Sequence, residues 1–389
     1  MRYRVNVELL SPTLIGDRRE PSAYFLTSRD FIPGGVLRAA FAKAIKEECP
    51  YETGDGRLNW VEFMGGEECS SCCWRGLCKN FGEIRFHHLY KDGARVAPLS
   101  AYRCKFEREH PVFDTLLATG APTCPACKKP GERVGGYLKD GKEEKAKRRL
   151  LMRLEVDPYL GVARERQLYA LRVLRTGQKF SGLLDVPEGA DSLPTDLELR
   201  IGAKTTSGLG RAKVTIEKAA PWSIEDLRRR VSQFQEKARQ QLQGLAEEEA
   251  FFLSFTLLAD ALPEGGLKAK DEWVDTDVLQ QELMVALLPK GSVVAERFAG
   301  VIKAYTDFNV YGGYNTAEPG NGRRNASVYV SAGSVFLCKV EGVLDDDLLQ
   351  SLRQLEERGL GARTEEGYGA VRVCDGFHLN TGGMDCGRK

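Results

Sequence analysis

The sequence lacks any long hydrophobic run. No apolar stretch approaches the roughly 20 residues that a membrane-spanning helix needs. The N-terminal residues MRYRVNVELL alternate like a strand and lack the apolar block of a signal peptide. Charge of one sign is not in excess either, because 56 Lys and Arg stand against 55 Asp and Glu, for a net charge of +1. Nucleic-acid binders are often basic overall, yet acidic faces can balance a local basic groove. We expect a cytoplasmic protein without membrane contact.

Histidine is also sparse, and recognisable arrangements of hydrolytic residues are missing. Only four histidines occur, none in a recognisable acid–base pair, and no clustered carboxylates of the metal-dependent nuclease type are evident. The phosphate-binding motif GxxxxGK[ST] is missing, which excludes a P-loop. Asp17, Asp30 and Asp157 lie in predicted loops, where an aspartate usually caps a turn or faces solvent. We therefore predict no catalytic residue, with Asp17 as the candidate if the chain is a nuclease.

What the sequence does contain is an internal repeat. The stretch IGAKTTSGLGRAKV at 201–214 returns as LGARTEEGYGAVRV at 360–373, with six of fourteen positions identical and two Lys–Arg exchanges. A strand, a helix and further strands are predicted before each copy. The chain of 389 residues is also too long for one typical core. We predict two related domains, at 1–220 and 221–389.

The repeated stretches have the residue types that bind phosphate groups. Glycines permit positive φ and close backbone approach, so exposed N–H groups can meet phosphate oxygens, while Lys and Arg add positive charge. The alternative is an ordinary glycine-rich hairpin, which the duplication disfavours. The predicted phosphate cradle of the first loop consists of Gly202, Lys204, Thr205, Thr206, Ser207, Gly208, Gly210 and Arg211.

Two further basic residues are less decisive. The second loop contains Arg363 but also Glu365 and Glu366, so it is either another phosphate contact or a structural or protein-binding hairpin. Arg38 lies one turn into the first predicted helix, and it could contact phosphate or form a surface ion pair.

Cysteine is abundant in one region. Eleven cysteines are present, and eight of them fall between residues 49 and 127. An odd number clustered in CxxC pairs disfavours a secreted disulfide framework and favours a metal site. The ligands predicted for a structural Zn²⁺, in an insertion at about 49–130, are Cys69, Cys72, Cys124 and Cys127. Cys73 or Cys78 could replace one of the first pair, and His87, His88 and His110 are further candidate ligands. The alternative is that these cysteines are reduced, partly buried and without a metal.

Several segments, taken in order, resemble the RAMP superfamily of CRISPR effector proteins. FIPGGVLRAAF resembles the family's IPG-S-LRGA segment, with Gly35 and Ala39 in place of Ser and Gly. CKNFGEIRFHHLY resembles its LFG…G-L-F segment, with Asn80 in place of Leu. The segments PLSAYRCKFEREHPVFDTLL, CPACKKP, RQLYALRVLRTGQKFSGLL and VSAGSVFLCKVEG are together most similar to the type III-D (Csx-ten) subfamily, which is related to the Cas-five group.

The resemblance implies an α+β fold of two tandem ferredoxin-like (RRM-like) domains, with the Cys-rich zinc-binding insertion in the first. It implies a non-catalytic subunit of a type III CRISPR interference complex that grips the 5′ repeat-derived handle of the crRNA. The expected partners are the crRNA, the backbone RAMP subunits and the large polymerase-like subunit, with target nucleic acid contacted indirectly. The alternatives are an endoribonuclease subunit that cuts target RNA with Asp17, and a zinc-stabilised scaffold that binds only proteins.

Overall fold

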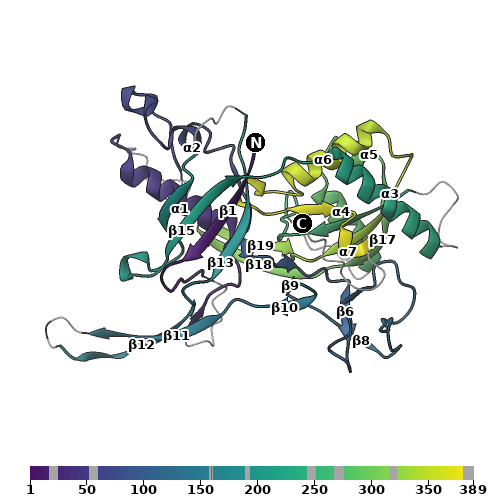
Figure 1. Ribbon diagram of the computed structural model, residues 1–389, viewed down its shortest axis with the longest axis horizontal. Helices are drawn as coiled ribbons and strands as arrows, with labels where there is room; N and C mark the ends of the chain where they lie inside the picture. The colour runs from purple at the N-terminus through teal and green to yellow at the C-terminus, as the bar shows by residue number, and fades with distance from the viewer. Residues whose placement is uncertain are drawn as a thin grey trace.

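The chain folds into two lobes, each organised around an antiparallel sheet (Figure 1). The computed structural model describes residues 1–16, 25–51, 60–156, 159, 161–188, 193–242, 251–266, 276–314 and 322–379. The fold is α+β, as predicted. Within these ranges, no helix is long and apolar enough to cross a membrane.

The first lobe is built on the N-terminal strand β1 (Arg2–Leu9), in which buried side chains alternate with more exposed ones because one face of the sheet is covered. Helix α1 (Gly34–Glu48) covers it, and Leu37, Phe41 and Ile45 share a core with the strand. The strand order is β14-β15-β1-β13-β3, and β4 also pairs with β13. The other strands are β3 (Arg85–Phe86), β4 (Tyr90–Lys91), β13 (Lys179–Asp185), β14 (Asp196–Arg200) and β15 (Arg211–Lys218).

The second lobe is built on β16 (Phe251–Leu257), which is buried at every position. Its sheet has the order β17-β20-β16-β21, and helices α3 and α6 contact each other and the sheet. The remaining elements are α3 (Ile224–Gln241), α4 (Thr276–Leu287), α5 (Val293–Glu296), β17 (Phe298–Tyr305), the hairpin β18 (Phe308–Tyr314) and β19 (Arg323–Val330), β20 (Val335–Val340), α6 (Asp346–Arg358), β21 (Val371–Val373) and α7 (Gly376–Leu379).

The two long amphipathic helices both begin where the sequence provides a cap. The hydroxyl of Ser223 accepts a hydrogen bond from the Asp226 N–H at the start of α3, and Asp345 caps α6 in the same way through the Leu348 N–H. Helix α6 ends at Gly359, which has φ 84°, a conformation that favours glycine.

The predicted insertion at 49–130 is not one unit. Its first part forms η1 (Glu67–Ser70) and α2 (Arg75–Lys79) beside α1. Strands β3 and β4 then return to the first sheet. The second part runs along the second lobe (Figure 1), where Lys303 Nζ donates to the Thr115 carbonyl at 2.9 Å and Arg95 pairs with Asp375 at 2.7 Å. Its strands are β5 (Arg95–Val96), β6 (Ala101–Cys104) and β7 (Phe113–Asp114), and their partners β8 (Gly131–Arg133), β9 (Tyr137–Lys139) and β10 (Lys142–Glu144) follow residue 130.

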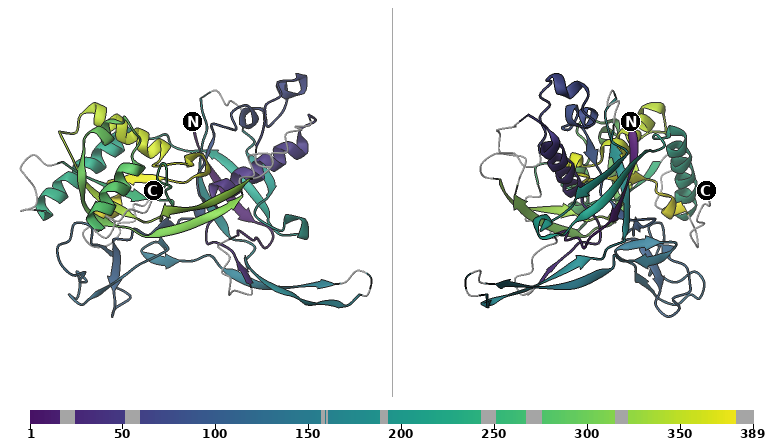
Figure 2. Two further views of the ribbon diagram at one scale, coloured as in Figure 1. Left: turned by 180° about the vertical axis from the view of Figure 1, so that it is seen from behind. Right: turned by 60° about the vertical axis from the view of Figure 1, so that its left-hand side comes forward.

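A long hairpin, hereafter the arm, projects from the first lobe (Figure 2). It consists of β11 (Arg148–Val156) and β12 (Ala163–Leu174), and β2 (Phe25–Thr27) pairs with β12 in parallel at its base. Leu171 and Val173 pack there against Leu14 and Leu209, which ties the arm to the loop that contains Leu209.

Candidate functional site

The two glycine-rich loops share one backbone conformation. Lys204 and Arg363 are both left-handed, with φ 60° and 62°. A short 3-10 turn follows each of them, η2 (Thr205–Ser207) in the first loop and η4 (Thr364–Glu366) in the second. Each turn ends at a left-handed glycine, Gly208 or Gly367. The sequence repeat is therefore a repeat of structure.

The same hydrogen bond closes both loops. The Ile201 N–H donates to the Gly210 carbonyl at 2.7 Å, and the Leu360 N–H donates to the Gly369 carbonyl at 2.8 Å. A Cβ atom at either of these glycines would overlap the carbonyl oxygen of its partner residue, and both glycines have positive φ. Only glycine satisfies both conditions, which explains why both copies retain it.

The first loop is exposed and basic. Lys204, Thr206, Ser207 and Gly208 are exposed, and Arg211 faces solvent beside them. Arg211 pairs with Glu198 at 3.1 Å, but the two side chains are 58% and 63% exposed, so the pair adds little stability and a phosphate could replace the carboxylate.

The predicted backbone cradle is partly used within the first loop. The N–H groups of Ser207 and Gly208 donate to the carbonyls of Lys204 and Thr205, at 3.0 and 3.3 Å. These two donors are satisfied internally, so an anion at the loop would depend chiefly on the Lys and Arg side chains.

The arm places an aromatic side chain beside the first loop. Lys204 Nζ lies 5.7 Å from the centre of the Tyr169 ring, within cation–π range. Tyr169 lies on β12 directly opposite Arg153 on β11, and its side chain is partly exposed. Tyr169 carries no local sequence signal for this position, because only the packing of the hairpin brings it to the loop.

The second loop occupies a different environment, the joint between the lobes. Arg363 donates to both carboxylate oxygens of Glu366 and, at 2.6 Å, to the Tyr329 hydroxyl. Burial by itself lowers the pKa of Arg363, but the adjacent Glu366 carboxylate outweighs it and raises the pKa. Arg85, on β3 of the first lobe, donates to the Thr364 carbonyl at 2.9 Å. These contacts favour the structural interpretation of this loop.

The other candidates for phosphate binding or catalysis lie elsewhere. Arg38 is 6% exposed and lies over the rings of Phe81 and Trp60 at 4.9 and 5.6 Å, so it is a buried residue and not a surface ion pair. Asp17 and Asp157 lie outside the described residues. Asp30 binds Arg148 at 2.9 Å and accepts from the Ala146 N–H, which fixes the base of the arm.

A second candidate site lies in the three-stranded sheet of β6, β7 and β8. The ligand atoms of Cys104, His110, Cys124 and Cys127 all lie within 4.8 Å of one another. The Cys104 and Cys127 sulfurs are 3.5 Å apart, and the Cys124 sulfur is 3.4 Å from His110 Nδ1. This set, hereafter the Cys₃His cluster, could hold a metal ion.

Local structure favours deprotonation of Cys104. Burial raises the pKa of Cys104, but hydrogen bonds from the N–H groups of Glu107 and Phe106, together with those to His110 and Cys127, outweigh this and lower it to about 6. The Lys128 N–H donates to the Cys124 carbonyl at 2.8 Å, and Lys128 is left-handed at φ 58°, which turns the chain back between Cys124 and Cys127. Because Zn–S bonds are about 2.3 Å, a tetrahedral site has sulfurs about 3.8 Å apart, a spacing close to that observed.

The grouping differs from the predicted one. Cys124 and Cys127 are joined by Cys104 and by His110, which was a lesser candidate, and not by Cys69 and Cys72. Cys69 and Cys72 lie beside α1 in the first lobe with Cys78. His87 and His88 are buried in that lobe as well: His87 binds Asp185 at 2.6 Å, and His88 Nδ1 accepts from the Gly34 N–H at 3.1 Å.

Comparisons with known proteins find weak structural similarity. No protein-family model and no curated protein match the sequence. A chain of the type III-B Cmr-beta complex bound to cognate target RNA and AMPPnP is 11% identical over 86% of each chain, with a TM-score of 0.44. A chain of the type III-B Cmr-beta complex bound to cognate target RNA is 11% identical over 95% of this chain and 96% of that chain, with a TM-score of 0.42. Similarities at this level do not establish a family.

Proposed function

We propose that this protein is a crRNA-binding subunit of a type III CRISPR interference complex and has no catalytic residue of its own. The observation that carries the proposal is the first glycine-rich loop, which presents Lys204 and Arg211 to solvent beside Tyr169. Cations of this kind position a phosphate backbone without reading its sequence. A partly exposed aromatic ring beside them can stack on an unpaired base.

The strand orders support two ferredoxin-like domains. In the second lobe the sheet strands and their helices have the chain order β16, α4, β17, β20, α6 and β21, which is β-α-β-β-α-β once α5 and the β18–β19 hairpin are set aside. The first of these strands lies between the third and the fourth. The first lobe has the same arrangement of strands, because β1 lies between β13 and β15 and β3 lies at the edge beside β13. One difference is the element before the glycine-rich loop, which is strand β14 in the first lobe and helix α6 in the second. Each loop leads into the fourth strand, so the two sites are equivalent positions of one fold.

The place of the subunit in its complex follows from the resemblance. We infer that the first loop grips the 5′ repeat-derived handle of the crRNA and that other faces contact the backbone RAMP subunits and the large polymerase-like subunit. Target nucleic acid is contacted only indirectly.

The Cys₃His cluster is proposed to hold a structural Zn²⁺. Three thiolates and one imidazole fill a tetrahedral coordination shell and leave no position for a substrate. The ion would tie β6 to the turn before β8, in a small sheet that the hydrogen bond from Lys303 to the Thr115 carbonyl joins to the second lobe.

The function is tested by the RNA that the protein retains. The chain is co-expressed with a CRISPR array, purified under nuclease treatment, and the bound RNA is sequenced. Protected fragments that begin with the repeat-derived handle are the expected result. Zinc-loaded, folded protein that retains no such RNA, alone and within the assembled complex, would overturn the proposal in favour of a protein-binding scaffold.

Catalysis is tested separately. The assembled complex is incubated with RNA complementary to the crRNA, and the D17A variant is compared with the wild type. We expect identical product patterns, because the proposed role is to bind. Loss of a cut in D17A would identify the endoribonuclease alternative.

A further inference from the structure

A second group of cysteines gathers in the first lobe, far along the sequence from Cys124 and Cys127. Cys49 follows the last turn of α1, Cys69 lies in η1, Cys72 lies in the following turn and Cys78 lies in α2. All four are half-buried, whereas Cys73 between them is exposed. The spacing is C-x19-C-x2-C-x5-C, and its central CxxC pair is a common element of zinc sites.

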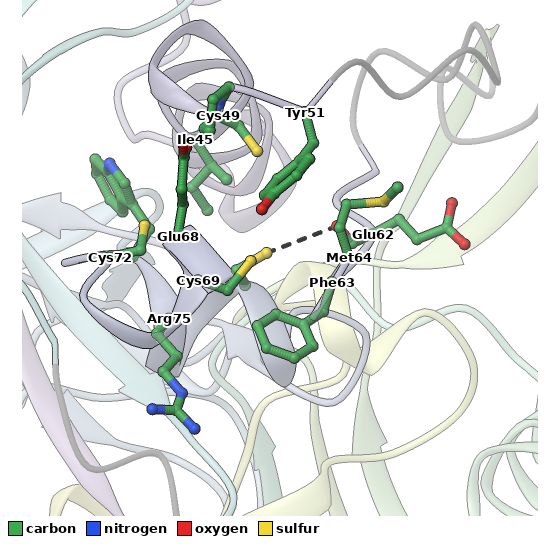
Figure 3. Close-up of a pocket in the computed structure, with 13 residues that line it drawn as sticks. Ile45, Cys49, Tyr51, Glu62, Phe63, Met64, Glu68, Cys69, Cys72 and Arg75 are labelled. Atoms are coloured by element: carbon green, nitrogen blue, oxygen red, sulfur yellow. Dashed lines mark hydrogen bonds between the residues drawn. The ribbon is translucent and has the colours of Figure 1, made fainter. Parts of the chain in front are cut away.

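The four thiols line one small cavity. Its volume is about 30 Å³, whereas pockets for organic ligands span roughly 300–1,000 Å³. Figure 3 shows Cys49 and Cys69 on opposite walls with their sulfurs directed into the space, and Cys72 at one side. The Cys78 sulfur lies 3.7 Å from the Glu62 carbonyl at another wall. Much of the remaining lining is apolar, including Ile45 and Phe63.

We propose that Cys49, Cys69, Cys72 and Cys78 form a second, four-thiolate Zn²⁺ site, separate from the Cys₃His cluster. A cavity of this size takes a single ion, and soft thiolates in an apolar surround select Zn²⁺ over harder cations. The ligand atoms of the Cys₃His cluster all lie within 4.8 Å of one another, and among the described residues the sulfurs of this second group are more widely spaced than that. One change of χ1 rotamer moves a cysteine sulfur by about 3 Å, so rotation of these side chains would bring the sulfurs closer to a common ion.

The ion would have a definite structural task. The segment with η1 and α2 consists of helices of four and five residues, and neither has a side-chain cap. It contacts α1 through Trp74, whose indole N–H donates to Glu48 at 2.6 Å and whose ring meets Phe41 edge-on at 6.3 Å. Helices this short are unstable alone. A zinc ion bound to Cys49 and to the segment would lock the segment onto the end of α1.

The number of zinc ions per chain tests the proposal, independently of any RNA binding. We expect two equivalents in the wild type by mass spectrometry of the purified full-length protein. One equivalent should remain in C69S/C78S, and one in C124S/C127S. The matched control is C73S, which changes an exposed cysteine of the same segment and should retain two. One equivalent in the wild type that C69S/C78S retains and C124S/C127S loses would overturn the second site.

A second measurement covers a failure of C69S/C78S to fold. In C124S/C127S only the proposed site remains, and Co²⁺ replaces Zn²⁺ in it. A strong thiolate-to-cobalt charge-transfer band is expected. Absence of that band, or alkylation under non-reducing conditions that reveals disulfides among the four cysteines, would count against the metal site.

Discussion

At the scale of single residues, two exposed cations distinguish the first loop from the second. Lys204 and Arg211 are exposed, and the weak surface pair of Arg211 with Glu198 leaves its charge available. The equivalent of Lys204 in the second loop is Arg363, whose guanidinium is held by Glu366 and Tyr329. A basic side chain in the same backbone conformation is therefore exposed to solvent in one copy and engaged by the protein in the other.

We predict that K204E/R211E weakens crRNA binding and flattens its salt dependence. Loss of one to two phosphate contacts should reduce the slope of log K against log salt by roughly one to two units. The measurement is a filter-binding titration at several salt concentrations. The control, R228E/R239E, places the same charge change on exposed positions of α3 in the other lobe and should leave the slope intact. An unchanged slope in K204E/R211E would exclude the loop from the interface.

His88 makes the stability of the first lobe depend on pH. Burial, followed by the nearby charge of Arg29, lowers the pKa of His88 to about 3. In the unfolded chain this histidine has its ordinary pKa of 6.5, so it binds a proton at a pH where the folded protein excludes one. The contribution of His88 to the free energy of unfolding is therefore complete above pH 6.5 and is lost as the pH falls from 6.5 toward 3. The loss is about 1.4 kcal/mol per pH unit across this window.

The variant H88N isolates this effect, because its amide oxygen can accept the Gly34 N–H bond that Nδ1 accepts in the wild type. Denaturant unfolding is measured for both proteins from pH 7 to pH 4. The free energies of unfolding should converge as pH falls, since only the wild type takes up this proton on unfolding. Parallel curves would show that His88 titrates normally in the folded protein.

At the scale of elements, the arm extends the basic loop into a longer surface. Leu151 and Leu171 bury the face that packs on the lobe, while Leu150, Met152 and Leu154 on the opposite face of β11 are 54%, 57% and 49% exposed. The register of β11 against β12 decides which side chains lie near Lys204, because a shift of one residue would exchange the two faces.

We predict that Tyr169→Ala weakens RNA binding by about 1–3 kcal/mol, the usual effect of losing one base–aromatic stack. Tyr169→Phe retains the ring and should bind as the wild type does. Affinity is measured at constant salt, and the salt slope should be the same for both variants, because no phosphate contact is removed. Equal affinities of the Ala and Phe variants would show that no base stacks on this ring.

At the scale of the whole molecule, the second glycine-rich loop holds the lobes together. Arg85 of the first lobe donates to the carbonyls of Thr364 and Glu357 in the second. Burial lowers the pKa of Arg85 to about 10, still far above neutral pH, so the joint contains a buried cation that is bonded to backbone oxygens.

We predict that Arg85→Met destabilises the protein by roughly 2–3 kcal/mol, since two carbonyls lose a charged donor. Hydrogen exchange should accelerate around Glu357 and Thr364 and change little in β1. The control Arg353→Met breaks a half-exposed pair with Glu357 on the same helix and should cost under about 1 kcal/mol. Equal effects of the two variants would argue against a joint at Arg85.

The sequence alone determined what depends on neighbours in the chain. The strand at β1, the capped helices α3 and α6 and the glycine-rich loops were predictable, because alternation, caps and positive-φ glycines act over a few residues. The turn between Cys124 and Cys127 has the same local origin.

Only the tertiary structure decided which distant residues meet. It joined Cys104 and His110 to Cys124 and Cys127, placed Tyr169 beside Lys204, and buried Arg38. It also divided the predicted insertion between the lobes. Of the two loops that share one backbone conformation, it left only the first exposed to solvent. The physical reason is that metal ligation and exposure depend on which surfaces pack together, and packing is set by contacts between residues far apart in the chain.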